Sequence, residues 1–381
     1  MLKKMNIFQR IFYAFCGEGK ARKLRTSIFC ILASMVFGGI ILLLLGKNPI
    51  VAYKSLLQGA GILPKIKYPG RKNQLTDILN LLDYTTPMVF ASLAVAVALK
   101  CGLFNICVSG TMIFTGILAT TLVGYSNLDP FVARILVVVI GIVGGGLLGA
   151  LIGWLKYRFN MNEVIVSIML NYIINYIASF VINSHYADPI SRESVEIGQN
   201  ARLTLMNFEA MGLKMNISLL FPFAILVVFL IDFLMKRTKL GFELKSVGTS
   251  PLASKYAGMN VKRTMILSMV ISGALAGLAG VAYYLGTYGS IQPRVLPALG
   301  FDAIAVALLG FITPIGCFFA SILVMIFQCG TSYLSSRLGV LREIASLITS
   351  ILLLFSACAV YFNQKADSYH NKFLMEDKSD E

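Results

Sequence analysis

Charged side chains are scarce in this chain. Asp, Glu, Lys and Arg make up 13% of its 381 residues, whereas hydrophobic residues make up 57%. A water-soluble fold of this length cannot hide so much apolar surface, which excludes an ordinary soluble protein. Imidazole is scarcer still, since the sequence has two histidines, His185 and His370, and its seven cysteines form no C-x-x-C pair. These shortages argue against a metal site and a disulfide framework, so we expect the cysteines to be small buried hydrophobic residues.

Sequence motifs for catalysis are also missing. A phosphate-binding loop requires G-x-x-x-x-G-K followed by Ser or Thr, and the nearest segment, GEGKA at 17–21, lacks the first glycine spacing and the hydroxyl. The sequence has no H-E-x-x-H motif, paired acids or nucleophile with a base. We therefore predict a protein that is not an enzyme and has no cofactor of its own. Energy for any transport must come from a partner or an ion gradient.

Long apolar runs are the dominant positive feature. A membrane-spanning helix needs about 20 apolar residues, and ten runs reach or approach that length. They predict an all-α polytopic membrane protein of about ten transmembrane helices. Two of the runs, 86–99 and 301–311, are too short to cross as straight helices, so eight to ten spans are expected, some of them broken. The ten runs cover residues 27–46, 86–99, 107–125, 131–155, 164–183, 217–235, 264–287, 301–311, 314–333 and 344–361.

The placement of Lys and Arg predicts the orientation. Seven of them precede Ser27 and seven more lie in the segment 236–263, so the positive-inside rule assigns both segments to the cytoplasm. The first outer loop conflicts with this assignment, because it carries six basic residues between Lys47 and Lys72. We expect three regions, which are a cytoplasmic basic N-terminus at 1–26, a transmembrane domain at 27–361 with a cytoplasmic loop at 236–263, and a polar cytoplasmic tail at 362–381.

The formal net charge of +15 indicates an anionic partner. No basic stripe interleaved with aromatic residues occurs outside the loops, so we expect no nucleic acid. Attraction to the anionic headgroups of a lipid bilayer is the simpler explanation of the charge.

The segment 238–263 is a polar island between two long apolar runs. Ser250 suits the N-cap of a helix, Pro251 its first position, and Gly258 a left-handed C-terminal cap. These signals predict a helix of about two turns, on which Leu252 and Tyr256 share one face. We interpret it as a docking element for a cytoplasmic partner, although an ordinary surface helix would carry the same signals. The predicted docking residues are Gly248, Ser250, Pro251, Leu252, Ala253, Tyr256, Ala257 and Gly258.

Polar residues interrupt several apolar runs. In GLFNICVSG, at 102–110, two glycines and an asparagine mark either a broken helix that lines a transport path or a plain turn. Asn171 and Asn175 share a helix face, where they either line a path or bond neighbouring helices. Asp302 is either a functional acid at membrane depth or a helix cap. The candidate path residues are Asn105, Ser109, Asn171, Asn175, Asp302 and Gln328.

Glycines crowd the apolar run at 131–155. Their spacing, with small residues about four positions apart, predicts close packing against another helix rather than a ligand site. The residues are Gly141, Gly144, Gly145, Gly146, Gly149 and Gly153.

Four segments, taken together and in this order, resemble a known family. They are GLFNICVSG at 102–110, NEVIVSIMLNYI at 162–173, TKLGFELKSVGTSPLASKYAGM at 238–259 and GFDAIAVALLGFITPIG at 300–316. The chain resembles the permease subunits of bacterial ATP-binding-cassette importers, in particular the nucleoside group related to ribose and branched-chain amino acid permeases.

This resemblance implies a ten-helix importer permease fold in the bacterial cell membrane. It implies three partners, namely a second permease subunit, a cytoplasmic ATP-binding-cassette ATPase that binds the ATP, and an extracellular nucleoside-binding lipoprotein. The chain resembles the longer of the two permeases, because it has an extra N-terminal span and a sizeable first outer loop. The docking helix matches the loop through which such permeases contact their ATPase.

Two departures from the family leave the solute open. After GLFNI the family usually continues with a glycine, a small residue, a glutamate, a glycine and a glutamine, whereas residues 107–111 are CVSGT. Residues 311–313 are FIT where the family has an arginine and an asparagine. The same machinery importing a sugar or a branched-chain amino acid therefore stays an alternative. So does a stand-alone ion-coupled transporter, for which Asp302 and Glu163 are the visible acids.

Overall fold

The computed structural model describes residues 22–68, 72–210 and 213–359, together with Phe12, 15–17, Gly70 and 361–368. Most of the expected N-terminal segment (residues 1–26) and of the tail (residues 362–381), with His370, lies outside these residues. The described chain is almost entirely helical. Its α-helices are α2 (Arg22–Leu44), α3 (Pro49–Gly59), α4 (Gln74–Lys100), α5 (Val108–Ala119), α6 (Pro130–Phe159), α7 (Glu163–Val181), α8 (Leu220–Arg237), α9 (Lys239–Thr249), α10 (Pro251–Tyr256), α11 (Val261–Val281), α12 (Leu299–Leu309), α13 (Pro314–Leu338) and α14 (Arg342–Ala357).

Six helices within the described residues are long and apolar enough to cross a membrane. They are α2, α4, α6, α11, α13 and α7 with its continuation to Tyr186. Three shorter apolar stretches accompany them, at Val108–Gly124, Leu299–Leu309 and Ser346–Phe355. Helix α8 carries three charged residues toward its end and is not among the six. The all-α membrane class is confirmed, whereas the count of ten spans stays a prediction.

Helix α4 corrects one expectation. The apolar run at 86–99 is too short to cross the membrane by itself, but it is the second half of a helix of 27 residues. Polar residues fill the first turns of that helix and conceal its length in the sequence. A capping box starts it, in which the side chains of Asn73 and Thr76 bond each other's backbone N–H groups. The short run at 301–311 does form a short helix, α12, of 11 residues.

Glycines bring α6 and α11 into direct backbone contact, as their spacing predicts. A Cβ on Gly145 would meet the carbonyl oxygen of Gly273 and would lie 2.8 Å from the Cα of Gly277. A Cβ on Gly149 would meet the carbonyl of Met269. The prediction of close helix packing is therefore confirmed, and these glycines form part of the core.

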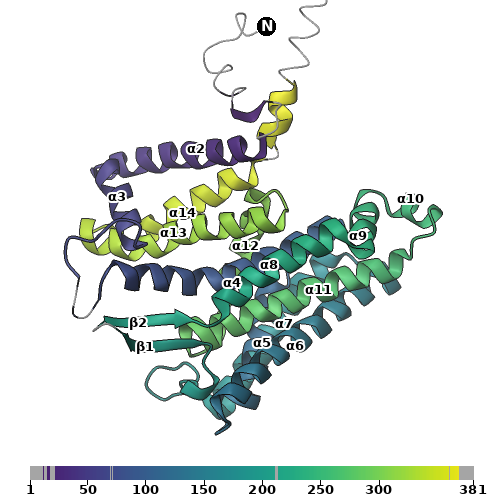
Figure 1. Ribbon diagram of the computed structural model, residues 1–381, viewed down its shortest axis with the longest axis horizontal. Helices are drawn as coiled ribbons and strands as arrows, with labels where there is room; N and C mark the ends of the chain where they lie inside the picture. The colour runs from purple at the N-terminus through teal and green to yellow at the C-terminus, as the bar shows by residue number, and fades with distance from the viewer. Residues whose placement is uncertain are drawn as a thin grey trace, which may run out of the picture.

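A β-hairpin, which the sequence did not lead us to expect, covers one end of the helices. Strands β1 (Thr204–Ala210) and β2 (Leu213–Ser218) pair antiparallel. The apolar run predicted to start at 217 therefore starts with α8 at Leu220 instead. The hydroxyl of Thr204 donates a 2.6 Å hydrogen bond to Asp83 Oδ1, which ties the hairpin to α4. Figure 1 shows the hairpin and the pair α9 and α10 at opposite ends of the long helices.

Three helices continue into π-helical segments. These are η1 (Thr120–Gly124) after α5, η2 (Ile182–Tyr186) after α7, and η4 (Ala282–Tyr288) after α11. A short 3₁₀ turn, η3 (Gln199–Ala201), lies in the loop before the hairpin. Widened turns of this kind are frequent at functional sites, because they redirect side chains that a regular helix would place elsewhere.

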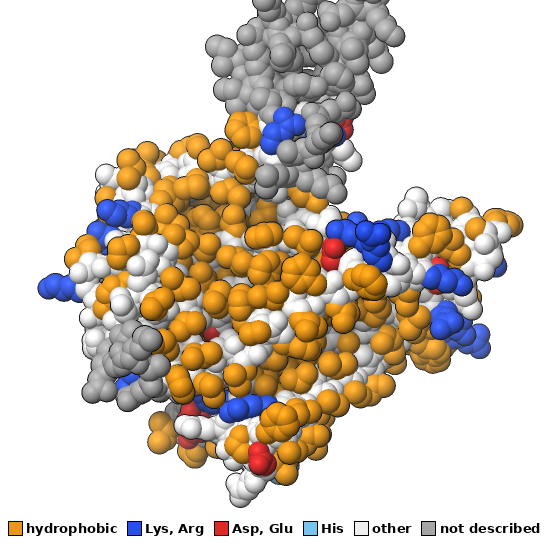
Figure 2. Space-filling view, viewed as in Figure 1, with side chains coloured by type: hydrophobic (Ala, Val, Ile, Leu, Met, Phe, Trp, Pro, Cys, Tyr) orange, Lys and Arg blue, Asp and Glu red, His pale blue; other side chains and the backbone are white. Residues whose placement is uncertain are grey.

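The surface fits a protein embedded in a bilayer. Figure 2 shows apolar side chains spread over the broad face of the helices, with Lys and Arg gathered at its edges, several of them beside α9 and α10. Among the large apolar residues exposed on α6 are Phe131, Val139, Val143 and Leu147. Such a continuous apolar surface is stable only against lipid or a partner.

Candidate functional site

A cavity of about 630 Å³, which we call the main cavity, lies between α4, η4, α12, α13 and α14. This volume is typical of sites for small molecules. Two of the six predicted path residues, Asp302 and Gln328, line it. The residues that line it are Gly59, Asp77, Asn80, Leu81, Tyr84, Pro87, Tyr283, Tyr288, Ala298, Leu299, Asp302, Met325, Gln328, Cys329, Thr331, Ser332, Ser346, Thr349, Ser350 and Leu353.

Asp302 and Gln328 form a polar pair in the wall of this cavity. Gln328 Nε2 donates a 2.8 Å hydrogen bond to Asp302 Oδ2. The pair joins α12 to α13 across 26 residues of sequence. Ala298 occupies the N-cap of α12, so the alternative that Asp302 is a helix cap is not what the structure shows. The carboxylate instead presents an acceptor to the cavity.

Three tyrosines also line the main cavity. The rings of Tyr283 and Tyr288 on η4 have their centroids 4.5 Å apart, and Tyr84 of α4 lies edge-on to Tyr288 at 6.4 Å. The π-helical turns of η4 bring Tyr283 and Tyr288, which are five residues apart, to one place. The sequence prediction missed all three rings, although the cluster of tyrosines at 283–288 was a visible signal.

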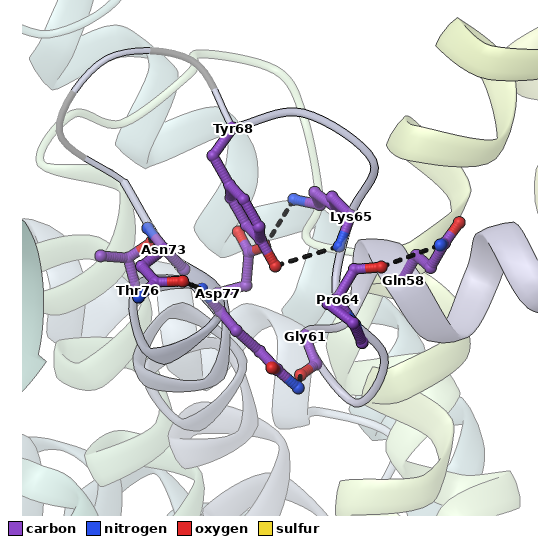
Figure 3. Close-up of polar contacts among 9 residues, drawn as sticks. Gln58, Gly61, Pro64, Lys65, Tyr68, Asn73, Thr76 and Asp77 are labelled. Atoms are coloured by element: carbon purple, nitrogen blue, oxygen red, sulfur yellow. Dashed lines mark hydrogen bonds and ion pairs between the residues drawn. The ribbon is translucent and has the colours of Figure 1, made fainter.

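The loop between α3 and α4 borders the main cavity with an ion pair. Figure 3 shows Lys65 reaching Asp77, and the Nζ to Oδ2 distance is 2.7 Å. The same Nζ lies 5.2 Å from the ring centroid of Tyr333, a cation–π distance. Gln58 Nε2 donates to the carbonyl of Pro64, 2.8 Å away, and holds the loop against α3. One of the six basic residues that conflicted with the predicted orientation is therefore neutralised locally.

A second, smaller cavity of about 180 Å³ lies on the other side of the tyrosines. Tyr283 and Tyr288 line both cavities, and Glu193 lies at the edge of the smaller one. Glu193 accepts hydrogen bonds from Ser290 Oγ at 2.5 Å and from Gln292 Nε2 at 2.6 Å. These donors hold the pKa of Glu193 below its usual range. The two tyrosine rings thus separate two compartments.

The remaining predicted path residues are buried away from the main cavity. Asn171 donates to the carbonyl of Ile106 at 3.0 Å and accepts from the N–H of Gly110 at 2.8 Å. Asn105 donates to Ser272 Oγ at 2.8 Å. Side-chain bonds between helices are therefore what these residues make here, and their place in a transport path stays a prediction. Of the other two, Ser109 donates to the carbonyl of Pro297, and Asn175 is buried on α7.

The predicted docking helix exists with its predicted caps. Helix α10 begins at Pro251, and Ser250 Oγ accepts from the N–H of Ala253 at 3.3 Å. Gly258 closes the turn with a left-handed φ of 79°. Leu252 and Tyr256 are 73% and 92% exposed, and α10 projects beyond the other helices (Figure 1). Its apolar ridge is therefore free for a partner, with Ala253 and Ala257 also exposed.

Helix α9 fills the first half of the predicted cytoplasmic loop. It runs from Lys239 to Thr249 and packs against α8, α11 and the end of α4. A Cβ on Gly248 would meet the carbonyl oxygen of Lys100, so this glycine is required for packing, and its part in docking stays a prediction. A Cβ on Gly102 would in turn lie 3.2 Å from the carbonyl oxygen of Gly248. The docking helix is thereby connected to α4, which lines the main cavity at its other end.

These features define a multi-pass membrane transport protein. The main cavity lies among apolar helices, and a short capped helix with an exposed apolar ridge projects from one end of the molecule. The chain belongs to the family described as branched-chain amino acid transport system / permease component, which matches residues 77–357. As a permease component it is a transmembrane subunit and not an enzyme.

Individual relatives extend the match to most of the chain. The nucleoside ABC transporter permease protein NupB of Lactococcus lactis is 35% identical over 349 residues, which cover 89% of this chain and 92% of the relative. The guanosine ABC transporter permease protein NupP of Bacillus subtilis is 33% identical over 350 residues, 91% of this chain and 94% of the relative. The glucose ABC transporter permease protein TsgB13 of Haloferax volcanii is 27% identical over 356 residues, 89% and 88% of the two chains.

Proposed function

We propose that this chain is the membrane-spanning permease subunit of an ATP-driven importer that translocates nucleosides across the bacterial cell membrane. The names of two relatives, which are 35% and 33% identical to this chain, support this solute. The proposal includes a second permease subunit, an ATPase on the cytoplasmic side and an extracellular nucleoside-binding lipoprotein, as the family resemblance implies. Placing the N-terminus in the cytoplasm follows from the distribution of Lys and Arg, and an even number of spans then places the C-terminus there as well.

The observation that carries the solute assignment is the combination of groups in the main cavity. Three tyrosine rings suit a flat nucleobase, and a carboxylate, amides and hydroxyls suit the ribose. No Lys or Arg occurs among the lining residues in the described part of the chain, and Lys65, which borders the cavity, is already paired with Asp77. A phosphate group would need such cations, so phosphorylated nucleotides are poor solutes for this cavity. The carboxylate of a free amino acid would lack a cationic partner for the same reason.

In this proposal, movements of the ATPase are coupled to the main cavity through the docking helix. The ATPase binds the exposed ridge of α10, and α10 continues directly from α9. Helix α9 abuts the end of α4 at Gly248 and Gly102. Helix α4 is continuous from Gln74 to Lys100, with Pro87 inside it. In this proposal, a shift of its cytoplasmic end is transmitted along this helix to Tyr84 and Asp77 at the cavity.

A sugar is the second candidate solute. One relative is named a glucose permease, and the hydroxyl ligands of the cavity suit a sugar too. Nucleosides are favoured because two relatives with nucleoside or guanosine names, at 35% and 33% identity, are more similar to this chain than the glucose relative at 27%.

Uptake of labelled solutes at low concentration tests the assignment. Cells that lack this gene should lose ATP-dependent uptake of adenosine, guanosine or uridine, while uptake of ribose, glucose and leucine stays normal. Restoring the gene should restore the uptake. Normal nucleoside uptake together with lost sugar uptake would assign the chain to sugar transport and leave its role as a permease intact.

A further inference from the structure

Two chemically different sets of side chains line the main cavity, and we call them its aromatic flank and its polar flank. One is aromatic, with Tyr84, Tyr283 and Tyr288, and the other carries the Asp302 and Gln328 pair. Base stacking on aromatic rings tolerates any base, since every base has a π-face. The aromatic flank therefore provides affinity for the base without choosing among bases. Recognition of the rest of the solute must then come from the polar flank.

Asp302 is the carboxylate of this cavity that is available to a solute. The other acid in the wall, Asp77, is paired with Lys65 at 2.7 Å. Asp302 Oδ2 accepts from Gln328, and Oδ1 receives no further side-chain hydrogen bond within the part of the chain that the structure describes. Gln328 fixes the plane of the carboxylate by this bond. The free oxygen is thus a preorganised acceptor.

We propose that Asp302, held by Gln328, binds the 2′- and 3′-hydroxyls of a ribonucleoside whose base stacks on the aromatic flank. This inference rests on the proposed function and names the part of the solute that the permease recognises. A carboxylate accepts two neighbouring hydroxyl donors well, and acids bind ribose hydroxyls in the same way in dinucleotide-binding folds. A 2′,3′-dideoxynucleoside has neither donor, so it leaves the acceptor desolvated and unpaired.

Cys329 provides a probe of occupancy inside the cavity. It lines the main cavity and is half-buried, as is Cys358, whereas the other five cysteines are buried. In the purified complex of permeases and ATPase carrying Cys358→Ser, a small neutral organomercury compound, which binds a thiol without needing a free thiolate, should label Cys329. Uridine should protect Cys329, and 2′,3′-dideoxyuridine should need about a tenfold higher concentration, as expected for losing hydrogen bonds to a charged acceptor.

Substitution of the acid isolates its role. With Asp302→Asn, protection by uridine should weaken about tenfold and the difference between the two nucleosides should disappear. Gln328→Leu should reduce that difference, because the carboxylate loses its fixed orientation. Asp232→Asn is the matched control, since Asp232 lies on α8 and pairs with Lys236. Asp232→Asn should leave unchanged the concentrations of uridine and of 2′,3′-dideoxyuridine that protect Cys329.

The outcomes separate this inference from the proposed function. If uridine protects Cys329 and Asp302→Asn keeps the original preference for uridine over dideoxyuridine, the hydroxyl site is overturned while nucleoside binding stands. A change confined to the preference between guanosine and adenosine would also overturn it, by assigning Asp302 to the base. If no nucleoside protects Cys329 and the intact importer takes up none, the proposed function fails as well.

Discussion

The side chain of Asn171 stabilises the turn between α4 and α5. Its amide bonds the carbonyl of Ile106 and the N–H of Gly110, two backbone groups beside the interruption after α4. Asn171 is buried, so water cannot readily replace those bonds. The sequence was compatible with a residue that lines a transport path or with one that bonds neighbouring helices. In the structure Asn171 makes bonds of the second kind.

The first prediction concerns this side chain. Asn171→Leu should destabilise the protein by about 2 kcal/mol or more, because two buried backbone groups lose their partner. Thermal unfolding of the purified complex in detergent should show the loss as a lower midpoint. Asn175→Leu is the control on the same helix face, since no side-chain hydrogen bond of Asn175 occurs within the described residues. Equal midpoints for the two variants would contradict the assignment.

Adjacent glycines on α6 allow a sharper test of packing. A Cβ on Gly145 would meet backbone atoms of Gly273 and Gly277, whereas a Cβ on Gly146 would have its nearest neighbour, Val270 Cγ1, at 3.7 Å. Gly145→Ala should therefore cost about 1–3 kcal/mol of stability by overpacking. Gly146→Ala should be neutral or slightly stabilising, because alanine favours a helix. The same unfolding measurement checks both, and equal destabilisation would refute the close approach of α6 and α11.

Helix α10 is an element whose limits could be predicted from the local sequence alone. Its caps depend on neighbours in the sequence, so Ser250, Pro251 and Gly258 predicted its limits correctly. Leu252→Asp should weaken binding of the ATPase, because the apolar ridge would bury a charge in the interface. Co-purification with the ATPase from membranes measures this, with Lys255→Ala as a control on the same helix. Full recovery of the ATPase with Leu252→Asp would show that α10 is not the docking surface.

Gly248 belongs to the connection between the docking helix and α4. Gly248→Ala should force α9 away from the carbonyl of Lys100, while the exposed ridge of α10 is unchanged. We expect normal co-purification of the ATPase and reduced nucleoside uptake. Gly258→Asn is a suitable control, because asparagine tolerates the left-handed conformation at that position. Simultaneous loss of ATPase binding would place Gly248 in the docking surface instead.

At the scale of the whole molecule, local patterns predicted the helices better than the cavity. Apolar runs located the long helices. Polar residues concealed the first half of α4, and no sequence pattern that we recognised predicted the hairpin of β1 and β2. The main cavity draws residues from α4, η4, α12, α13 and α14, so its composition depends on packing between segments far apart in sequence. Asp302 was recognised because an acid is rare in an apolar run. Tyr84 and Tyr288 were not, because tyrosine is common at membrane interfaces.

The end of the molecule opposite the docking helix is closed by two loops that bond each other. The N–H of Ser194 donates to the carbonyl of Ile291 at 3.0 Å, and the N–H of Ile291 donates to Ser194 Oγ at 2.9 Å. The carboxylate of Glu193 adds its bonds from Ser290 and Gln292. This loop pair borders the smaller cavity and the two tyrosines that separate it from the main one. In the proposed orientation it faces the binding lipoprotein.

Glu193 makes the strength of this loop pair dependent on pH. The hydroxyl of Ser290 and the amide of Gln292 lower the pKa of Glu193 from its ordinary value of 4.5, so the ionised form stabilises the folded loops. That contribution is complete above the ordinary value and is lost as the pH falls through the lowered one. Glu193→Ala should therefore speed hydrogen exchange at 289–292 near pH 7, measured by mass spectrometry, and the difference from the original protein should vanish in acid. Glu193→Gln, which keeps one acceptor, should have a smaller effect. A difference between the original protein and Glu193→Ala that stays constant with pH would show that the charge of Glu193 does not hold the loops together.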